Sequence, residues 1–228
     1  MAKRLSKEQL ETDPLLTSYY LFISFLKRNL TAVIFASIAV VLVVGGGITY
    51  YFYAQAKERE AQDLLVDTEV AFQMGEYDIA LWGDGNLVQV GLIEIINNYG
   101  RTNAGNLARY YAAVSEAELG NYFDALEYIE RFNPPRGILG VGPISFHAVV
   151  LANLGEYERA ADIFVKAAEW DINESTTPQN LLNAAQACME AENFARATQL
   201  VNRVLSEYED SQVADQARRL EGMLSVRQ

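Results

Sequence analysis

The chain has 228 residues, a formal net charge of −12, one histidine and one cysteine. Because Cys188 is the only cysteine and His147 the only histidine, an intramolecular disulfide, a thiolate metal cluster and a two-histidine metal site are all excluded. The acidic balance also argues against nucleic-acid binding, since a negatively charged surface repels phosphate backbones.

The first predicted element is a membrane span. Residues 29–56 carry no charged side chain, and the apolar segment Leu30–Tyr53 within them is 24 residues long. A helix of that length reaches roughly 36 Å, slightly more than the thickness of the hydrocarbon core of a bilayer. Aromatic residues, which favour membrane interfaces, stand near both ends: Tyr19, Tyr20, Phe22, Tyr50, Tyr51, Phe52 and Tyr53. We therefore predict a leader (1–29), a transmembrane helix (30–53) and a second domain (54–228).

The distribution of basic residues predicts the orientation of this span. Five Lys or Arg residues precede it, whereas Lys57 and Arg59 are the two that lie within about fifteen residues after it, so the positive-inside rule places the N-terminus in the cytosol. A cleaved secretory signal is the alternative, because Ala54-Gln55-Ala56 has the small-x-small form of a signal-peptidase site. The uncleaved anchor is favoured, since cleavable signals have apolar cores of about 7–15 residues behind a short basic leader.

The charge is shared unevenly between the two sides of the span. Residues 1–28 hold five basic and three acidic residues, a net +2, and residues 57–228 hold thirteen basic and twenty-seven acidic residues, a net −14. The domain after the span is therefore strongly acidic, and contact with lipid is expected from the anchor alone.

Beyond the span, four short segments share a pattern of glycine or glutamate, an aromatic residue and an alanine. They begin 45, 35 and 37 residues apart, close to the period of about 34 of tetratricopeptide hairpins except for an insertion in the first. Glycine permits a left-handed turn between two helices, the aromatic residue packs the corner, and alanine lets the second helix approach its partner. The segments are Gly75–Ala80, Gly120–Ala125, Gly155–Ala160 and Glu192–Ala197.

The residues around these turns predict an all-α fold, a single N-terminal transmembrane helix followed by a tetratricopeptide-like array of about four hairpins. Apolar residues recur at helical spacing on both sides of the turns, and no stretch shows sustained alternation. Thr177-Pro178 predicts a helix start, and the two prolines in Asn133–Gly137 predict a loop. Nothing between residues 54 and 60 breaks a helix, so the span is expected to continue into Ala61–Met74. Gly45-Gly46-Gly47 is open to two interpretations, a helix-docking face or a flexible patch.

No motif in the chain predicts catalysis. Trp82–Asn86 suits a tight turn and lacks the ligand set of an EF-hand. Gly137–Gly142 has neither the spacing nor the preceding strand of a dinucleotide-binding turn, and we predict a loop between repeats. We expect His147 to be packed or half exposed without an adjacent nucleophile, and Cys188 to be buried. The sequence therefore predicts no enzymatic activity, cofactor, metal or small-molecule substrate.

The repeat register nominates a protein-binding groove. The first helices of stacked hairpins form a concave surface on which such arrays usually bind peptides or protein segments. For any one projected side chain, packing against a neighbouring helix is an equal alternative. The projected groove residues are Tyr110, Val114, Ser145, Val149, Asn153, Leu182, Gln186 and Glu190.

Several short sequence segments within the repeats are more specific than the repeat pattern itself. They are Gly83-Asp84-Gly85-Asn86, Gly91-Leu92, Ile95-Ile96, Tyr99-Gly100, Thr102, Ala104-Gly105-Asn106-Leu107-Ala108, Tyr110-Tyr111 and Glu174-Ser175-Thr176-Thr177-Pro178. In these residues the chain resembles the ancillary SecYEG translocon subunit family, often called YfgM-like. The resemblance implies a single-pass inner-membrane protein of the bacterial envelope with a periplasmic domain and no enzymatic activity. It also implies association with the protein-export channel and with a membrane-anchored periplasmic chaperone.

Two other classes of function remain open from the sequence. The same anchor and array would serve as a scaffold or adaptor of another envelope machine, for secretion, motility or cell-wall synthesis. The second class is an enzyme or a released periplasmic binding protein, and cleavage after Ala56 is the observation that tests it.

Overall fold

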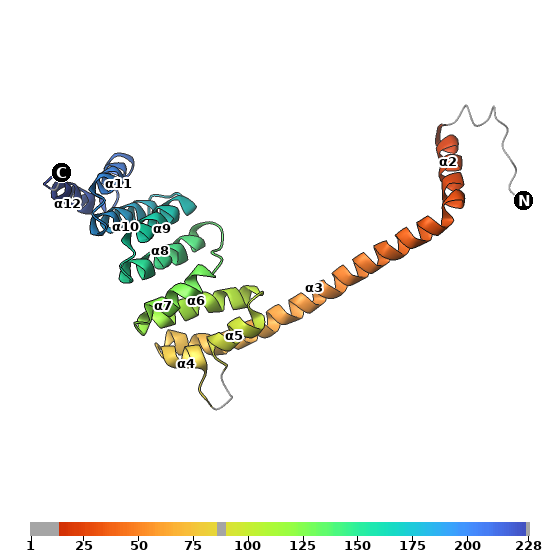
Figure 1. The fold of residues 1–228 in the computed structure, drawn as a ribbon, viewed down its shortest axis with the longest axis horizontal. Coiled ribbons are helices and arrows are strands. Elements are labelled where there is room, and N and C mark those ends of the chain that lie inside the picture. Colours follow the sequence, from red (N-terminus) through yellow and green to blue (C-terminus); the bar gives the residue numbers. More distant parts are fainter. Residues whose placement is uncertain (1–13, 86–89, 227–228) are drawn as a thin grey trace, which may run out of the picture. The chain divides into compact units, whose positions relative to one another are not determined.

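The computed structural model describes residues 14–85 and 90–226, and it divides the chain into two compact units, residues 1–56 and 57–228. Apart from turns, loops and an isolated bridge between Gly83 and Val90, the described residues are helical. The predicted all-α class is therefore confirmed, as is the array of helical hairpins (Figure 1).

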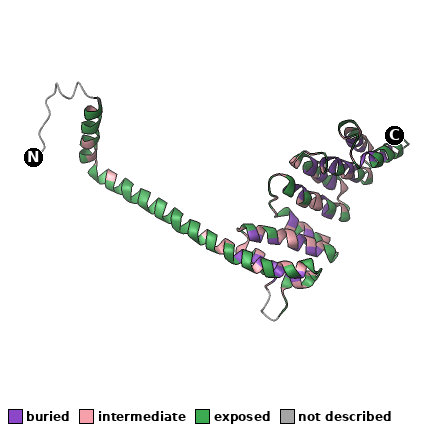
Figure 2. Cartoon of the chain, turned by 180° about the vertical axis from the view of Figure 1, so that it is seen from behind, coloured by how far each residue is buried: buried purple, intermediate pink, exposed green. Residues whose placement is uncertain are grey.

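The first unit contains α2 (Pro14–Arg28) and the beginning of α3 (Leu30–Gln73). The apolar part of α3 is long and apolar enough to cross a membrane, and none of it is buried against the rest of the chain (Figure 2). As expected, α3 continues without a break from the apolar segment into the array, and it stays helical through Gly45-Gly46-Gly47. The separate helix α2 was not predicted.

The second unit is a series of hairpins. The last part of α3, from Lys57, pairs with α4 (Tyr77–Trp82), and α5 (Leu92–Tyr99) follows the insertion. The next three hairpins are α6 (Asn103–Glu118) with α7 (Tyr122–Glu130), α8 (Ile138–Asn153) with α9 (Tyr157–Trp170), and α10 (Thr177–Glu190) with α11 (Phe194–Glu207). A last helix, α12 (Ala214–Leu224), packs on α11.

The four predicted turns share one hydrogen-bonding pattern. In each, the amide after the left-handed residue donates to the carbonyl five residues before it. The pairs are Glu76 to Ala71, Asn121 to Glu116, Glu156 to Leu151 and Asn193 to Cys188, at 2.8–2.9 Å. This is the Schellman pattern, which satisfies carbonyls that a helix C-terminus otherwise leaves unpaired. Three of the left-handed residues are glycines with φ of 76°, 85° and 78°, whereas the fourth is Glu192 with φ of 58°.

The substitution Glu192→Gly should therefore stabilise the protein by about 1 kcal/mol, because the left-handed conformation costs roughly that much for a residue with a Cβ atom. Urea denaturation of the full chain in detergent, followed by far-ultraviolet circular dichroism, measures the change. The matched variant Gly155→Ala makes the reverse exchange at the third turn and should destabilise by a similar amount. A loss of stability in Glu192→Gly would contradict this account of the turns.

The alanine of each repeat has the predicted role. Ala80, Ala125, Ala160 and Ala197 lie in the second helix of successive hairpins, and each is 0% exposed. A larger side chain at these positions would push the two helices of the hairpin apart, because the interior is already close-packed.

Two polar contacts fix the first hairpin and the insertion after it. Thr68 of α3 is fully buried, and its hydroxyl lies 2.7 Å from the Val90 carbonyl oxygen, its hydrogen-bond acceptor beyond the insertion. The Glu58 carboxylate of α3 accepts the backbone amides of Asn103 and Ala104 at 2.7 and 3.0 Å. These amides belong to the first turn of α6, where they have no partner within the helix. The last part of α3 is therefore bonded to both the insertion and the second hairpin.

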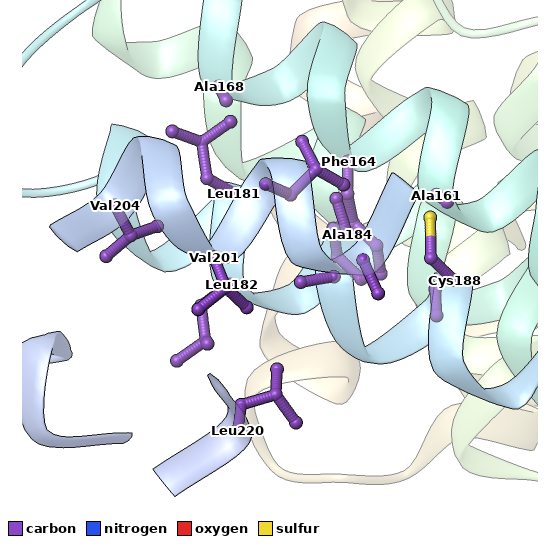
Figure 3. Packing of buried hydrophobic residues seen from close by; sticks show 14 of the residues in the cluster. Ala161, Phe164, Ala168, Leu181, Leu182, Ala184, Cys188, Val201, Val204 and Leu220 are labelled. Carbon is purple, nitrogen blue, oxygen red and sulfur yellow. The ribbon is translucent and has the colours of Figure 1, made fainter. Parts of the chain in front are cut away.

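The apolar core of the array has two main parts. One joins the last part of α3 to α4, α5 and α6, and includes Leu65, Leu81, Leu92 and Ile95. The other joins α8 to α12, and Figure 3 shows part of it, with Leu181 and Leu182 of α10 among side chains of α9, α11 and α12.

The prediction of a loop over Gly137–Gly142 was wrong beyond its first residue, because α8 begins at Ile138. Gly142 lacks the Cβ atom that would clash with the ring of Pro143 in a helical conformation, so the proline is accommodated inside the helix. Gly140 serves close packing, since a Cβ atom there would collide with the Pro135 carbonyl oxygen and the Trp170 indole. The predicted loop Asn133–Gly137 is present.

Candidate protein-binding surface

The projected groove residues all lie on first helices of hairpins, as the register required. Tyr110 and Val114 are half buried on α6, and Ser145 is half buried on α8. The exposed members are Val149 and Asn153 on α8 and Gln186 and Glu190 on α10. These exposed side chains are available for contact with another molecule.

Two of the projected residues hold the array together instead. Leu182 is fully buried in the core between α10, α11 and α12, so it does not line a surface. The Ser145 hydroxyl lies 2.6 Å from Oδ1 of Asn180, a buried residue of α10, so this pair ties the third hairpin to the fourth. For both residues the packing alternative is the one that the structure supports.

A set of aromatic rings, of which the projected groove includes only Tyr110, runs across the first three hairpins. All six side chains are half buried, and each lies within 6.2 Å of another ring, centroid to centroid. We call this set the aromatic strip; its members are Phe72, Tyr77, Tyr110, Tyr111, Phe132 and Phe146. The repeat pattern could have identified two of these rings, since Tyr111 and Phe146 both stand nine residues before the turn glycine of their hairpins.

Tyr110 is the centre of the strip. Its ring lies 5.9 Å from that of Phe146 on α8, 5.5 Å from that of Phe132 after α7, and 6.2 Å from that of its neighbour Tyr111. Tyr111 in turn lies 4.7 Å from Phe72 of α3. The strip therefore connects three hairpins through side chains that keep part of their surface accessible.

The hydroxyl of Tyr111 fixes the ring in place. It donates a hydrogen bond of 3.0 Å to Oε1 of Glu69 on α3. Burial, together with this bond to a carboxylate, raises the pKa of Tyr111 to about 12. Tyr111 therefore stays protonated at neutral pH and remains a donor to Glu69.

His147 follows Phe146 on α8 and is half buried, as the sequence predicted. Its Nε2 atom is buried and has no hydrogen-bond partner among the described residues. Burial lowers the pKa of His147, and the nearby Glu130 carboxylate opposes that shift. The ring is therefore mainly neutral at pH 7.

Cys188 is buried on α10, as predicted, and burial raises the pKa of its thiol. A thiol held in this way is a poor nucleophile at neutral pH. Over the ranges 14–85 and 90–226, no three His, Cys, Asp or Glu side chains come together in a way that could hold a metal ion. Asn86 of the predicted Trp82–Asn86 turn lies outside the described residues.

An open hollow of about 570 Å³ lies at the other end of the array, where α10 begins and α11 ends. Its lining includes four carboxylates, those of Glu174, Glu207, Glu209 and Asp210. This end of the array therefore repels anionic ligands and adds to the acidity of the domain.

In comparisons with protein-family models, with curated proteins and with solved structures, no match to the chain was found.

Proposed function

We propose that the chain is a membrane-anchored protein-interaction module of the bacterial inner membrane, with a cytosolic N-terminus and a periplasmic helical array. The observation that carries the proposal is the aromatic strip, which offers partly accessible rings of three hairpins to a partner. Aromatic side chains are enriched at the centres of protein interfaces, because they supply a large contact area with few rotatable bonds.

The net charge of the array bears on the chemistry of the partner. The array carries a net charge of −14, so a partner segment with acidic residues would be repelled and a basic or neutral apolar segment would be favoured. Val149 and Asn153 of α8 stay exposed and extend the accessible surface along the first helix of the third hairpin. The proposed role is binding rather than catalysis, without a cofactor or small-molecule substrate.

For the identity of the partner, we propose the protein-export channel and a periplasmic chaperone, so that the chain would be an ancillary translocon subunit linking the two. This step is supported by the resemblance in Gly83–Tyr111 and Glu174–Pro178 to the ancillary SecYEG translocon subunit family.

The test is photocrosslinking in cells, with a benzophenone amino acid placed at Tyr110 or at Phe146. We expect adducts with channel or chaperone subunits, identified by mass spectrometry, because both rings lie in the strip. Ile172 is 67% exposed outside the strip and is the control position, from which these adducts should be absent.

Equal adducts from Ile172 would contradict the strip as the binding surface. Adducts only with components of secretion, motility or cell-wall machinery would replace the translocon role with that of a scaffold of another envelope complex. A mature N-terminus at Lys57 would remove the anchor from the proposal.

A further inference from the structure

The helix α2 precedes the span and is too short to be a second one. It has 15 residues, and its first thirteen, residues 14–26, carry no charge. A helix of this length reaches about 22 Å, well below the roughly 30 Å of hydrocarbon that a spanning helix must cross. Uncharged stretches of this size occur in buried core helices or in segments that lie at a membrane interface. The α2 helix is not a buried core helix, because Leu15, Tyr19 and Phe22 are 81%, 59% and 58% exposed.

The side chains of α2 are partly sorted by face. At 100° per residue, Leu15, Tyr19, Phe22 and Leu26 fall on one side of the helix, which we call the apolar stripe. Thr17, Ser24 and Arg28 fall on the opposite side, flanked by Tyr20 and Leu21, and we call these three the polar stripe. A helix with this division can bury one side in acyl chains while its other side remains in water.

The place of α2 in the chain determines which apolar medium it meets. It ends at Arg28, and Asn29 separates it from α3, whose apolar part begins at Leu30. The Phe25 carbonyl, near the end of α2, accepts hydrogen bonds from both the backbone amide and the side-chain amide of Asn29, each at 3.0 Å. When α3 spans a bilayer, the end of α2 is held at the level of the lipid headgroups.

The end of α2 also carries the charge that suits this level. Lys27 and Arg28 form its last turn, where cations are favoured by the helix dipole and can contact anionic headgroups. The rings of Tyr19 and Tyr20 lie 5.9 Å apart, edge to face, and tyrosine favours the interface between acyl chains and water.

We propose that α2 lies in the plane of the membrane interface, with its apolar stripe in the acyl chains and with Lys27 and Arg28 on anionic headgroups. This inference rests on the anchor of the proposed function. It adds a second, in-plane contact with lipid, which would hold the N-terminal side of the span at a defined depth.

The test is nitroxide accessibility in the full chain, reconstituted into vesicles of phosphatidylethanolamine and phosphatidylglycerol. In a Cys188→Ala background, the label is attached through Leu15→Cys or Phe22→Cys on the apolar stripe, or through Ser24→Cys on the polar stripe. Oxygen partitions into acyl chains and a nickel chelate stays in water. We expect Leu15→Cys and Phe22→Cys labels to relax more with oxygen than with the chelate, and the Ser24→Cys label to show the reverse.

Two outcomes would overturn the proposal. Relaxation by the chelate at all three positions would place α2 in water, and poor access for both reagents on the apolar stripe would indicate a second copy or another protein against it. Extraction with alkaline carbonate tests the anchor separately. If the chain resists extraction while α2 is in water, this inference fails and the anchor stands. If the chain is extracted, the anchor fails as well.

The contribution of the basic residues is tested by Lys27→Gln with Arg28→Gln. We expect this double variant to reduce the difference in oxygen and chelate relaxation between the Phe22→Cys and Ser24→Cys labels. Reconstitution of the chain without these two substitutions into neutral phosphatidylcholine should reduce it as well. The same difference under all three conditions would exclude anionic headgroups as the partner of Lys27 and Arg28.

Discussion

The substitution Leu182→Ala should destabilise the array by about 2–5 kcal/mol, the usual cost of truncating a leucine in a close-packed core. Leu182 is 0% exposed, and Figure 3 shows it in the core with Val201 of α11 and Leu220 of α12. The truncation removes apolar contacts and leaves a cavity where three helices meet. Urea denaturation of the full chain in detergent, monitored by circular dichroism, measures the loss.

The matched control is Gln186→Ala, one turn later on the same helix. Gln186 is exposed, so its truncation should change the free energy of unfolding by no more than about 0.5 kcal/mol. If the two variants were equally stable, Leu182 would belong to a surface, as the repeat register projected, and the assignment to the core would fail.

The substitution Gly140→Ala should cost about 1–3 kcal/mol, although alanine is normally the better helix residue. The added methyl group would meet the Pro135 carbonyl oxygen, and backbone cannot move aside as a flexible side chain can. It would also displace the Trp170 indole, whose N–H donates to that same carbonyl at 3.0 Å. The change in unfolding midpoint, together with the fluorescence of Trp170, reports both effects.

Gly222→Ala provides the control for Gly140→Ala. Gly222 lies within α12, and no atom stands within 4 Å of the position that its Cβ would take. Alanine there should stabilise the protein by roughly 0.5–1 kcal/mol through helix propensity alone. Opposite signs for the two variants are expected, and equal gains would show that α8 is not packed against the loop before it.

Local patterns predicted the hairpins because their signals do not depend on distant residues. The turn glycines and the repeat alanines act within one hairpin, and the observed φ values and burial follow from that local role. The insertion was predicted from the first repeat interval, and the continuation of the span into the array from the lack of a helix breaker.

Two of the helices that the structure describes were not predicted, although each carries a pattern. The sequence predicts residues 14–28 as part of a leader, because Tyr19 and Phe22 stand close to the longer apolar segment and are also the residue types that mark the edge of a membrane span. In α12, Ala217, Leu220 and Leu224 have helical spacing and are buried, but this helix has no partner of the repeat type to mark it. Helices outside a repeat have periodicity as their main sequence signal, which is weaker over eleven residues.

By itself, the sequence determined the helical class, the positions of the turns, the apolar segment and the acidity of the array, since each depends on neighbouring residues or on composition. Only the tertiary structure decided which faces of these helices are accessible. Leu181 and Leu182 are consecutive and both fully buried, because α9 and α11 pack against α10 and the core extends to α12. The aromatic strip likewise exists because three hairpins stack, and the register of one helix does not state how the next one is placed against it.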